Sequence, residues 1–138
     1  MRPIPTKDKS GEPNGYLIPL WSVNEAPWLR PDQVYVTVVD PGKSKGPHLH
    51  MKRRGFFHCI SGQVAFILRV DGYYVRYEAS PNNGPVIVPP GTPCEIRNVG
   101  PSPAFVVNMP SPAWAKDDQD DWPVDDWDTG EGSVLSFP

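Results

Sequence analysis

Proline and glycine recur along the whole chain, and they constrain its fold more than any other feature. The 138 residues include 19 prolines and 12 glycines. Proline inside a helix removes a backbone donor and clashes with the preceding turn, so this density disfavours long helices. The segments between these residues are short and rich in valine and aromatic side chains, which is typical of strands. We therefore predict one all-β domain, because a chain of this length can bury a single core without help from disulfides or a structural metal.

The expected strands are bounded by turn residues and follow one another at short intervals. The clearest is QVYVTVVD, residues 33–40. Residues 63–70 form another, and Asp71-Gly72 then predicts a two-residue hairpin turn, because both residues tolerate positive φ. Further strands are expected over residues 56–60, 73–79, 86–88, 94–98 and 104–109, with an edge strand over 16–21 after a loop-like start. This succession of short strands indicates a β-sandwich or barrel.

The charge is unevenly distributed along the chain. Residues 1–116 hold all 13 Lys and Arg and eight of the 16 acidic residues, and the other eight acids lie between Asp117 and Glu131. A positive body suits an anionic ligand. Nucleic-acid binding is not expected, because no basic and aromatic platform is evident and the acidic tail would repel phosphates. The tail has two interpretations: a solvated segment, or a clamp whose tryptophans, Trp122 and Trp127, pack on the body.

Other features bear on compartment and organisation. No stretch of about 18 apolar residues and no charged start with an apolar run is present, so neither a membrane span nor a secretory signal is expected. Cys59 and Cys94 lack CxxC spacing and are expected to be free thiols, consistent with a cytoplasmic protein. We expect three regions: an N-terminal arm over residues 1–21, a barrel over 22–115 and an acidic tail over 116–138.

All three histidines lie within KGPHLHMKRRGFFHCISGQVAFIL, residues 45–68. In a strand, positions two apart point to the same face, so His48 and His50 are expected to share one hollow while Leu49 points away. Imidazole titrates near neutrality and is suited to moving a proton. Neighbouring cations suit a developing oxyanion or a phosphate. His58 lies in an apolar strand and is expected to be a core residue.

These segments resemble the cupin family. The residues that carry the likeness to its first motif are Gly42, Gly46, His48, His50 and Gly62, and those that resemble its second motif are Pro89, Pro90, Gly91 and Asn98. Within cupins, residues 30–128 are similar to the small sugar-nucleotide branch, which includes dTDP-4-dehydrorhamnose 3,5-epimerase-related proteins and dTDP-sugar 3,4-ketoisomerases. The resemblance implies a cupin-type double-stranded β-helix, that is, a jelly-roll barrel.

Two ligand positions of metal-binding cupins are replaced in this chain. The glutamate position falls at Arg54 or Gly55, and Cys94 stands where the second motif has histidine. A typical cupin site needs three nitrogen ligands and a carboxylate, and a cation nearby would repel a divalent ion. The resemblance therefore implies neither a metal nor another cofactor. A metal-dependent cupin enzyme that uses His48, His50 and Cys94 stays open as an alternative.

The resemblance implies an isomerase or epimerase that acts on a nucleotide-diphosphate 4-keto sugar by metal-independent proton transfer through an enediol or enediolate. His48 matches the catalytic base, His50 matches the second histidine of the ketoisomerases, and Tyr35 matches a tyrosine that assists. The epimerases use a late tyrosine, and none follows Tyr77 here, which favours ketoisomerase-like activity. The expected substrate-binding cations are Lys45, Arg54 and Arg97.

Two further expectations concern partners. Sheet edges need cover, and the arm with its apolar YLIPLW segment is predicted to pair across a partner's sheet in a homodimer. The remaining alternative to an enzyme is a non-catalytic cupin that binds a sugar or nucleotide.

Overall fold

The computed structural model describes residues 3–113, 119–130 and 134–137. Every regular element within these ranges is a strand, and no helix occurs in the part of the chain that they cover. The strands are β1 (Ile4–Lys7), β2 (Pro13–Leu17), β3 (Tyr35–Val39), β4 (Ser44–His48), β5 (Gly55–Ser61), β6 (Val64–Val70), β7 (Tyr73–Ala79), β8 (Val86–Val88), β9 (Cys94–Asn98), β10 (Ala104–Asn108) and β11 (Val134–Phe137). The described residues accordingly contain no helix of the length and apolarity that a membrane span needs.

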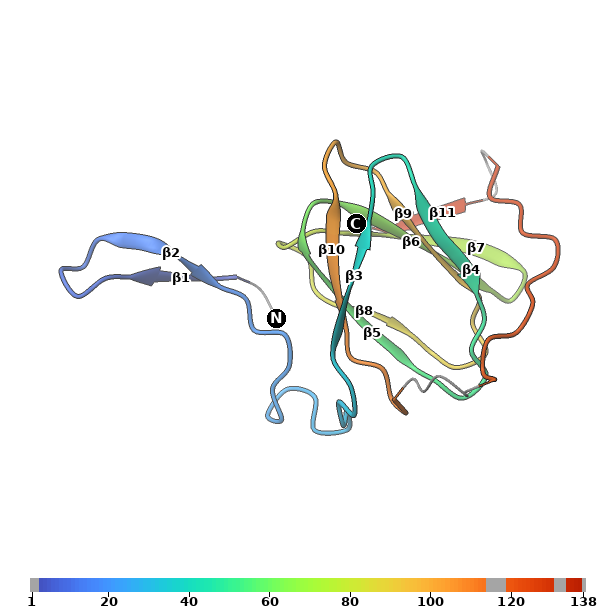
Figure 1. Ribbon diagram of the computed structural model, residues 1–138, viewed down its shortest axis with the longest axis horizontal. Helices are drawn as coiled ribbons and strands as arrows, with labels where there is room; N and C mark the ends of the chain where they lie inside the picture. The colour runs from blue at the N-terminus through green and yellow to red at the C-terminus, as the bar shows by residue number, and fades with distance from the viewer. Residues whose placement is uncertain (1–2, 114–118, 131–133, 138) are drawn as a thin grey trace.

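Two sheets face each other and form the barrel (Figure 1). One has the strand order β3-β10-β5-β8, and the other has the order β11-β7-β6-β9-β4. The pairings within them are antiparallel, except that β11 runs parallel to β7. Neighbouring strands such as β10 and β3 are far apart in sequence, which is the connectivity of a jelly roll. The predicted all-β, cupin-type jelly-roll barrel is confirmed.

The main core lies between the two sheets. Along β6, Val64, Phe66 and Leu68 point inward and are almost fully buried. Each such side chain contributes about 1.5–3 kcal/mol when it leaves water. The turn that follows β6 has positive φ at both central residues, 52° at Asp71 and 81° at Gly72, as predicted for a primed hairpin. Cys59 and Cys94 are both buried free thiols, as expected.

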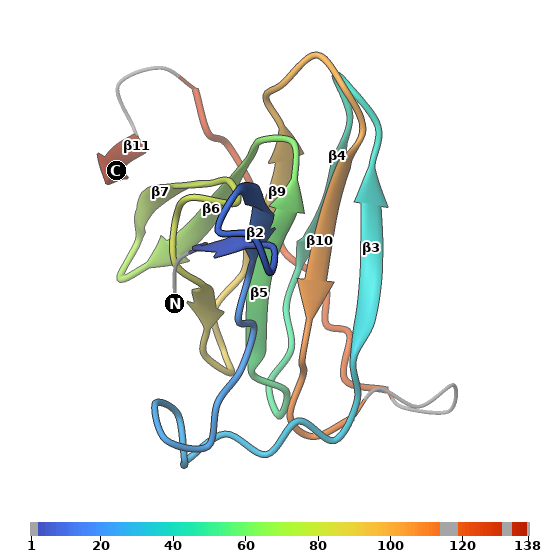
Figure 2. The same ribbon diagram turned by 90° about the vertical axis from the view of Figure 1, so that its left-hand side faces the viewer.

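The N-terminal segment differs from the expected loop-like start. Its residues form the hairpin β1–β2, which stands away from the barrel in Figure 1 and points toward the viewer in Figure 2. The strand expected over residues 16–21 ends at Leu17. Ile4, Tyr16 and Leu17 are exposed on the hairpin. The strand geometry assumed for His48 and His50 holds only for His48, which ends β4, and the start of β4 was not predicted because SKGPH carries no apolar alternation.

A second apolar cluster covers part of the outer face of the four-stranded sheet, beside β5. Leu20, Trp21, Ala26 and Leu29 follow the hairpin and pack against Phe56 and Met109. His58 is buried on the same face of β5, with its ring 5.7 Å from that of Phe56. Burial lowers the pKa of His58, although its bond to the Leu20 backbone acts in the opposite direction. His58 is thus a core residue, as expected.

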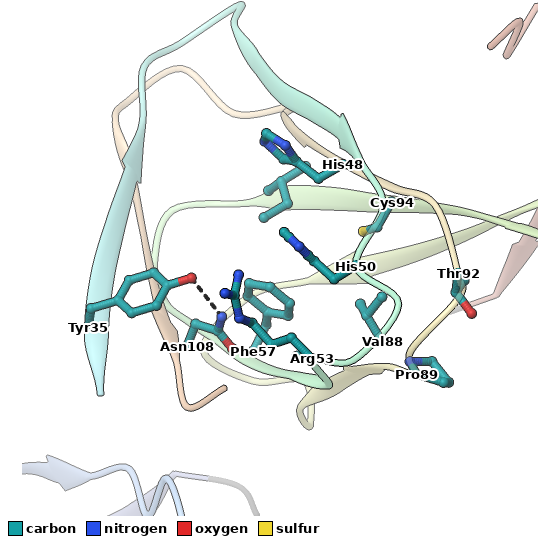
Figure 3. Close-up of a pocket in the computed structure, with 12 residues that line it drawn as sticks. Tyr35, His48, His50, Arg53, Phe57, Val88, Pro89, Thr92, Cys94 and Asn108 are labelled. Atoms are coloured by element: carbon teal, nitrogen blue, oxygen red, sulfur yellow. Dashed lines mark hydrogen bonds between the residues drawn. The ribbon is translucent and has the colours of Figure 1, made fainter. Parts of the chain in front are cut away.

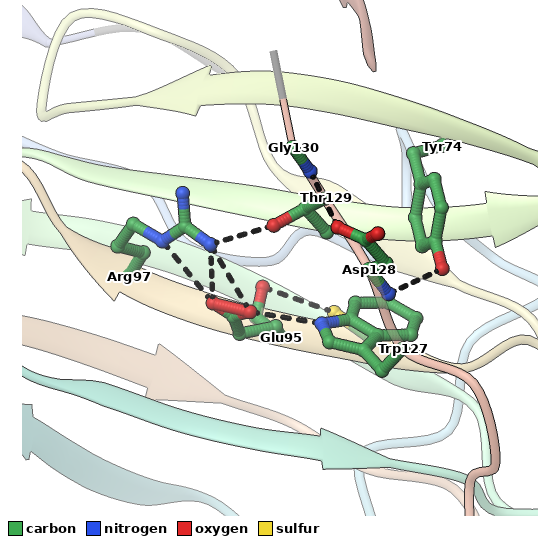
Figure 4. A network of polar contacts seen from close by, with 8 residues as sticks. Tyr74, Glu95, Arg97, Trp127, Asp128, Thr129 and Gly130 are labelled. Atoms are coloured by element: carbon green, nitrogen blue, oxygen red, sulfur yellow. Dashed lines mark hydrogen bonds and ion pairs between the residues drawn. The ribbon is translucent and has the colours of Figure 1, made fainter. Parts of the chain in front are cut away.

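Residues 119–130, here called the C-terminal strap, run along the five-stranded sheet. Figure 4 shows how this strap is held. The Trp127 indole N–H donates to Glu95 at 2.9 Å, and the Trp127 and Tyr74 rings meet edge to face with their centroids 5.1 Å apart. The Tyr74 hydroxyl also accepts the Asp128 N–H at 2.8 Å. Trp127 therefore packs on the barrel, as the clamp interpretation predicts, whereas Trp122 is half exposed. Residues 116–118, 131–133 and 138 of the expected tail lie outside the described residues.

Candidate active site

A cavity opens between the two sheets, with about 480 Å³ of empty space that includes its open mouth (Figure 3). One wall is apolar and is formed by side chains that also belong to or pack against the main core, including Phe57, Val88 and Ile96. The polar lining comes from Tyr35, His48, His50, Arg53, Thr92 and Asn108. The cavity therefore has an apolar wall and a few hydrogen-bonding groups at defined positions.

The structure brings His48 and His50 to the same cavity. His48 ends β4 opposite Cys94 of β9, and His50 lies in the loop that follows. Their rings are stacked, with centroids 6.1 Å apart and planes inclined by 16°. Gly46 makes this turn of the chain possible: its φ is +100°, and a Cβ there would lie 2.7 Å from the Cys94 carbonyl oxygen. A larger residue at position 46 would therefore displace the strand that carries His48.

Both imidazoles contact the C-terminal strap. The Nδ1 of His50 is hydrogen-bonded to the backbone oxygen of Asp120. The Nδ1 of His48 lies 3.6 Å from an Asp121 carboxylate oxygen, in a pair whose side chains are 50% and 65% exposed. Water screens an exposed pair of this kind, so its energy is small. The bond from His50 is the better defined of the two contacts.

Tyr35 and Asn108 form a fixed pair across the neighbouring strands β3 and β10. The buried Oδ1 of Asn108 accepts the Phe56 N–H at 3.0 Å, which orients the amide so that Nδ2 donates to the Tyr35 hydroxyl at 2.8 Å. A hydroxyl that accepts in this way keeps its own proton for another acceptor. Tyr35 therefore presents a donor to the cavity.

Sequence reasoning missed Asn108, although its strand carried a signal. In β10, Ala104 and Val106 face the core, and the alternation of a strand places Asn108 on the same face. A polar side chain at an inward position needs a partner or a function. That rule would have singled out Asn108 in the sequence AFVVN.

Arg53 is the second residue that sequence reasoning missed. It is only 7% exposed, and its guanidinium extends into the cavity near His50 and Asn108 (Figure 3). Arg54 was expected in this role instead, but its guanidinium lies over the Trp28 ring, 5.3 Å from the ring centroid. Three successive cations, Lys52 to Arg54, do not reveal which one faces inward, because the loop has no strand periodicity.

Lys45 and Arg97 do not line the cavity either. Lys45 is exposed on β4. Arg97 lies on the outer face of β9, where it pairs with Glu95 at 2.9 Å and donates to Thr129 at 3.1 Å (Figure 4). Asn98, from the second motif, holds neighbouring backbone segments together, because its amide donates to the backbone oxygens of Val39 and Ser102. None of the three expected cations thus lines the cavity, and within the described ranges the cation that does so is Arg53.

The cavity residues do not fit a cupin metal centre. In the described ranges, no three His, Cys, Asp or Glu side chains are grouped so that they could hold a metal ion. Burial raises the pKa of the Cys94 thiol well above its usual range, which disfavours the thiolate that binds metals. The Arg53 guanidinium faces the same cavity and would repel a divalent cation. We therefore derive no chemistry through a metal.

Comparison with known proteins gives a family and a fold. The family model described as FdtA: WxcM-like, C-terminal matches residues 4–122. No curated protein matches the sequence. The structure is similar to a dTDP sugar isomerase from Desulfovibrio desulfuricans G20, with a TM-score of 0.73 at 16% identity over 89% of this chain and 79% of that one.

Two other solved structures share the fold. One is a variant of the 3,4-ketoisomerase QdtA from Thermoanaerobacterium thermosaccharolyticum in complex with TDP-4-keto-6-deoxyglucose, with a TM-score of 0.66 and 19% identity over 85% of this chain and 81% of that one. The other is the capsular polysaccharide assembling protein CapF from Staphylococcus aureus, with a TM-score of 0.62 and 23% identity over 66% of this chain. This chain spans only 27% of CapF. At these identities the likeness establishes the fold.

Proposed function

The chain belongs to the FdtA family, WxcM-like, C-terminal, and from that premise we propose that it is an isomerase of a nucleotide-linked 4-keto sugar. The observation that carries the proposal is the stacked pair of His48 and His50 in one cavity with a buried arginine. Ketoisomerisation is favoured over 3,5-epimerisation, because the chain has no tyrosine after Tyr77 to act as the late acid. Two proteins with this fold are named as a dTDP-sugar isomerase and a 3,4-ketoisomerase, which supports the substrate class.

The reaction requires two proton movements on carbon. A base removes the proton from C3, the C3–H electrons form a C3–C4 double bond, and the C4 oxygen takes a proton. The resulting enediol loses the proton of the C3 oxygen and gains one at C4, so that the ketone has moved from C4 to C3. Imidazole is suited to such steps at neutral pH. We assign His48 as the base and His50 as its partner in returning the proton.

The other polar residues act on the developing oxyanion. Arg53 supplies a positive charge that is itself buried, and such a charge is worth more to a developing oxyanion than one in water. Tyr35 supplies a hydroxyl donor, since Asn108 already donates to its oxygen. We therefore assign Arg53 and Tyr35 to the sugar oxygens. Lys45, Arg54 and Arg97 do not line the cavity, so we assign none of them to the sugar oxygens.

Deuterium exchange tests this function directly. The protein is incubated in heavy water with TDP-4-keto-6-deoxyglucose, and exchange at C3 together with conversion to the 3-keto isomer is followed by NMR. His48→Asn should slow both processes about 10²–10⁴-fold, the usual contribution of a general base. Binding without exchange by the unaltered protein would favour a non-catalytic sugar-binding cupin. Unchanged turnover in His48→Asn would refute the assigned base.

We also propose that the protein is a homodimer. The projecting hairpin exposes Ile4, Tyr16 and Leu17, and the outer face of the four-stranded sheet exposes Val36, Val38 and Phe105. Pairing the hairpin with a partner's sheet would cover apolar surface and a sheet edge. Light scattering should give a mass of two chains for the unaltered protein. The double variant Tyr16→Ser, Leu17→Asp should have the mass of a single chain. A monomeric unaltered protein would refute this arrangement. A cytoplasmic location stays a prediction.

A further inference from the structure

We propose that Asp120 of the C-terminal strap is a positioning residue that fixes the tautomer and orientation of His50. The sequence alone gives no reason to connect Asp120 with His50, because the two are 70 residues apart and Asp120 lies in an acid-rich tail. The structural part of the proposal concerns the free protein. Its consequence for catalysis rests on the proposed function.

The carboxylate of Asp120 holds the loop that follows His50. It accepts hydrogen bonds from the backbone N–H groups of Met51 at 2.9 Å, Lys52 at 3.1 Å and Arg53 at 3.0 Å. Asp120 is only 5% exposed. Three successive N–H groups that converge on one anion form a strong backbone site, because charge-assisted bonds are about twice as strong as neutral ones.

Asp120 stays ionised at neutral pH in this setting. Loss of solvent acts to raise the pKa of its carboxyl, but the three backbone bonds outweigh this and hold the pKa below its ordinary value. A carboxylate accepts at both oxygens, whereas a protonated acid would offer a donor to groups that are themselves donors. Ionised Asp120 is therefore the form that matches the loop.

The backbone of the same residue orients the imidazole. The Asp120 carbonyl oxygen is bonded to Nδ1 of His50, and a carbonyl oxygen only accepts, so Nδ1 carries the proton. Nε2 then holds the lone pair, and this is the nitrogen left to act on a ligand. Free histidine side chains in water favour the opposite tautomer, with the proton on Nε2. The strap thus selects a form that the side chain alone does not favour.

A backbone bridge completes the attachment on the other side of His50. The Trp122 N–H donates to the Leu49 oxygen at 2.8 Å, so residues 120 and 122 hold the chain both before and after His50. Arg53, whose side chain lines the cavity, lies in the same loop, and its backbone N–H donates to the Asp120 carboxylate. One acidic residue therefore controls the placement of two groups that line the cavity.

Nitrogen NMR of the full chain tests the structural claim without substrate. With only three histidines, the rings can be assigned by single replacement, and two-bond proton–nitrogen correlations report which nitrogen is protonated. We expect the Nδ1–H form for neutral His50. Asp120→Ala should shift His50 toward the Nε2–H form, and Asp120→Asn, which keeps one acceptor oxygen, should have a smaller effect. Asp125→Asn, a matched change at an exposed acid of the strap, should leave the spectrum unchanged.

Two results would overturn the proposal: Nε2–H on His50 in the unaltered protein, or an unchanged His50 spectrum in folded Asp120→Ala. If Asp120→Ala does not fold, the tautomer of the unaltered protein and the Asp120→Asn variant still decide.

The kinetic consequence is separate. Asp120→Ala should lower kcat by up to about 100-fold, because a misplaced reactive group can cost this much, and change KM less. Asp120→Asn should recover part of the loss. If the tautomer is as expected but the unaltered protein exchanges no proton of a 4-keto sugar, the proposed function fails and the role of Asp120 in positioning His50 stands. If exchange occurs but His50 carries its proton on Nε2, the proposed function stands and the positioning role of Asp120 fails.

Discussion

Arg53 and Arg54 are neighbours in the chain, yet their side chains lie on opposite sides of the loop that leads into β5. Arg53 reaches into the cavity, and Arg54 lies over Trp28 on the outer surface. The backbone of Arg54 also exchanges hydrogen bonds with Ser111, at 2.9 and 3.1 Å, which holds this reversal in place. Two residues of the same type thus form a natural pair for separating a role in the site from a general effect of charge.

The first prediction uses this pair. Arg53→Gln should lower kcat for ketoisomerisation about 10²-fold, because a fixed donor to a developing oxyanion is lost. Arg54→Gln removes the same charge one residue away and should leave kcat unchanged. Steady-state kinetics of both variants check this, and equal losses in the two would mean that the cavity placement of Arg53 is irrelevant to turnover.

The second prediction concerns Asn108. Asn108→Val removes the acceptor of the Phe56 N–H, and a buried donor left without a partner costs about 1–3 kcal/mol. We expect the free energy of unfolding to fall by this amount in denaturant titrations. Tyr35→Phe, which removes only the hydroxyl that Asn108 binds, should cost less. Equal stability of Asn108→Val and the unaltered protein would contradict the structural role of the amide.

The third prediction is a pH dependence of stability. Burial holds the pKa of His58 in the folded state below its ordinary value of 6.5, so the unfolded chain takes up a proton more readily. The stability that neutral His58 contributes is complete above pH 6.5 and is lost as the pH falls through 6.5 toward the folded-state pKa. One proton gives a slope of at most about 1.4 kcal/mol per pH unit.

Denaturant titrations between pH 7.5 and 5.5 measure this slope. His58→Gln should flatten the pH dependence, even if the variant is less stable throughout. An identical slope in the variant and the unaltered protein would show that other groups cause the acid sensitivity.

The fourth prediction concerns the attachment of the C-terminal strap. Trp127→Phe keeps an aromatic ring against Tyr74 but removes the N–H that donates to the Glu95 carboxylate. A hydrogen bond to a charged group contributes about 1.5–3 kcal/mol, and Trp127 is only half-buried, so we expect a loss at the lower end. Hydrogen exchange of residues 119–130 should speed up in the variant. Unchanged exchange would mean that the strap is held elsewhere, for example at Asp120.

Local patterns were enough to predict most strands of the two sheets. The valine-rich run at residues 33–40 became β3, and the apolar run at 63–70 became β6, which is buried on both faces from Val64 to Leu68, because β-branched and aromatic residues between turn residues favour strands. Asp71-Gly72 adopted the predicted turn because few residues tolerate positive φ. The hairpin β1–β2 was missed, since its strands are almost entirely exposed and lack the alternation that a buried face imposes.

What the chain determined by itself was most of the strands of the two sheets, because each depends on a short run of residues between turns, whereas the jelly-roll class was implied by the resemblance to cupins. The choice of Arg53 over Arg54, the pairing of Tyr35 with Asn108, and the bonds from Asp120 to a loop some 70 residues away were decided only by the tertiary structure. The physical reason is that a loop has no fixed side-chain period, and a contact between distant segments depends on how two sheets pack rather than on either segment alone.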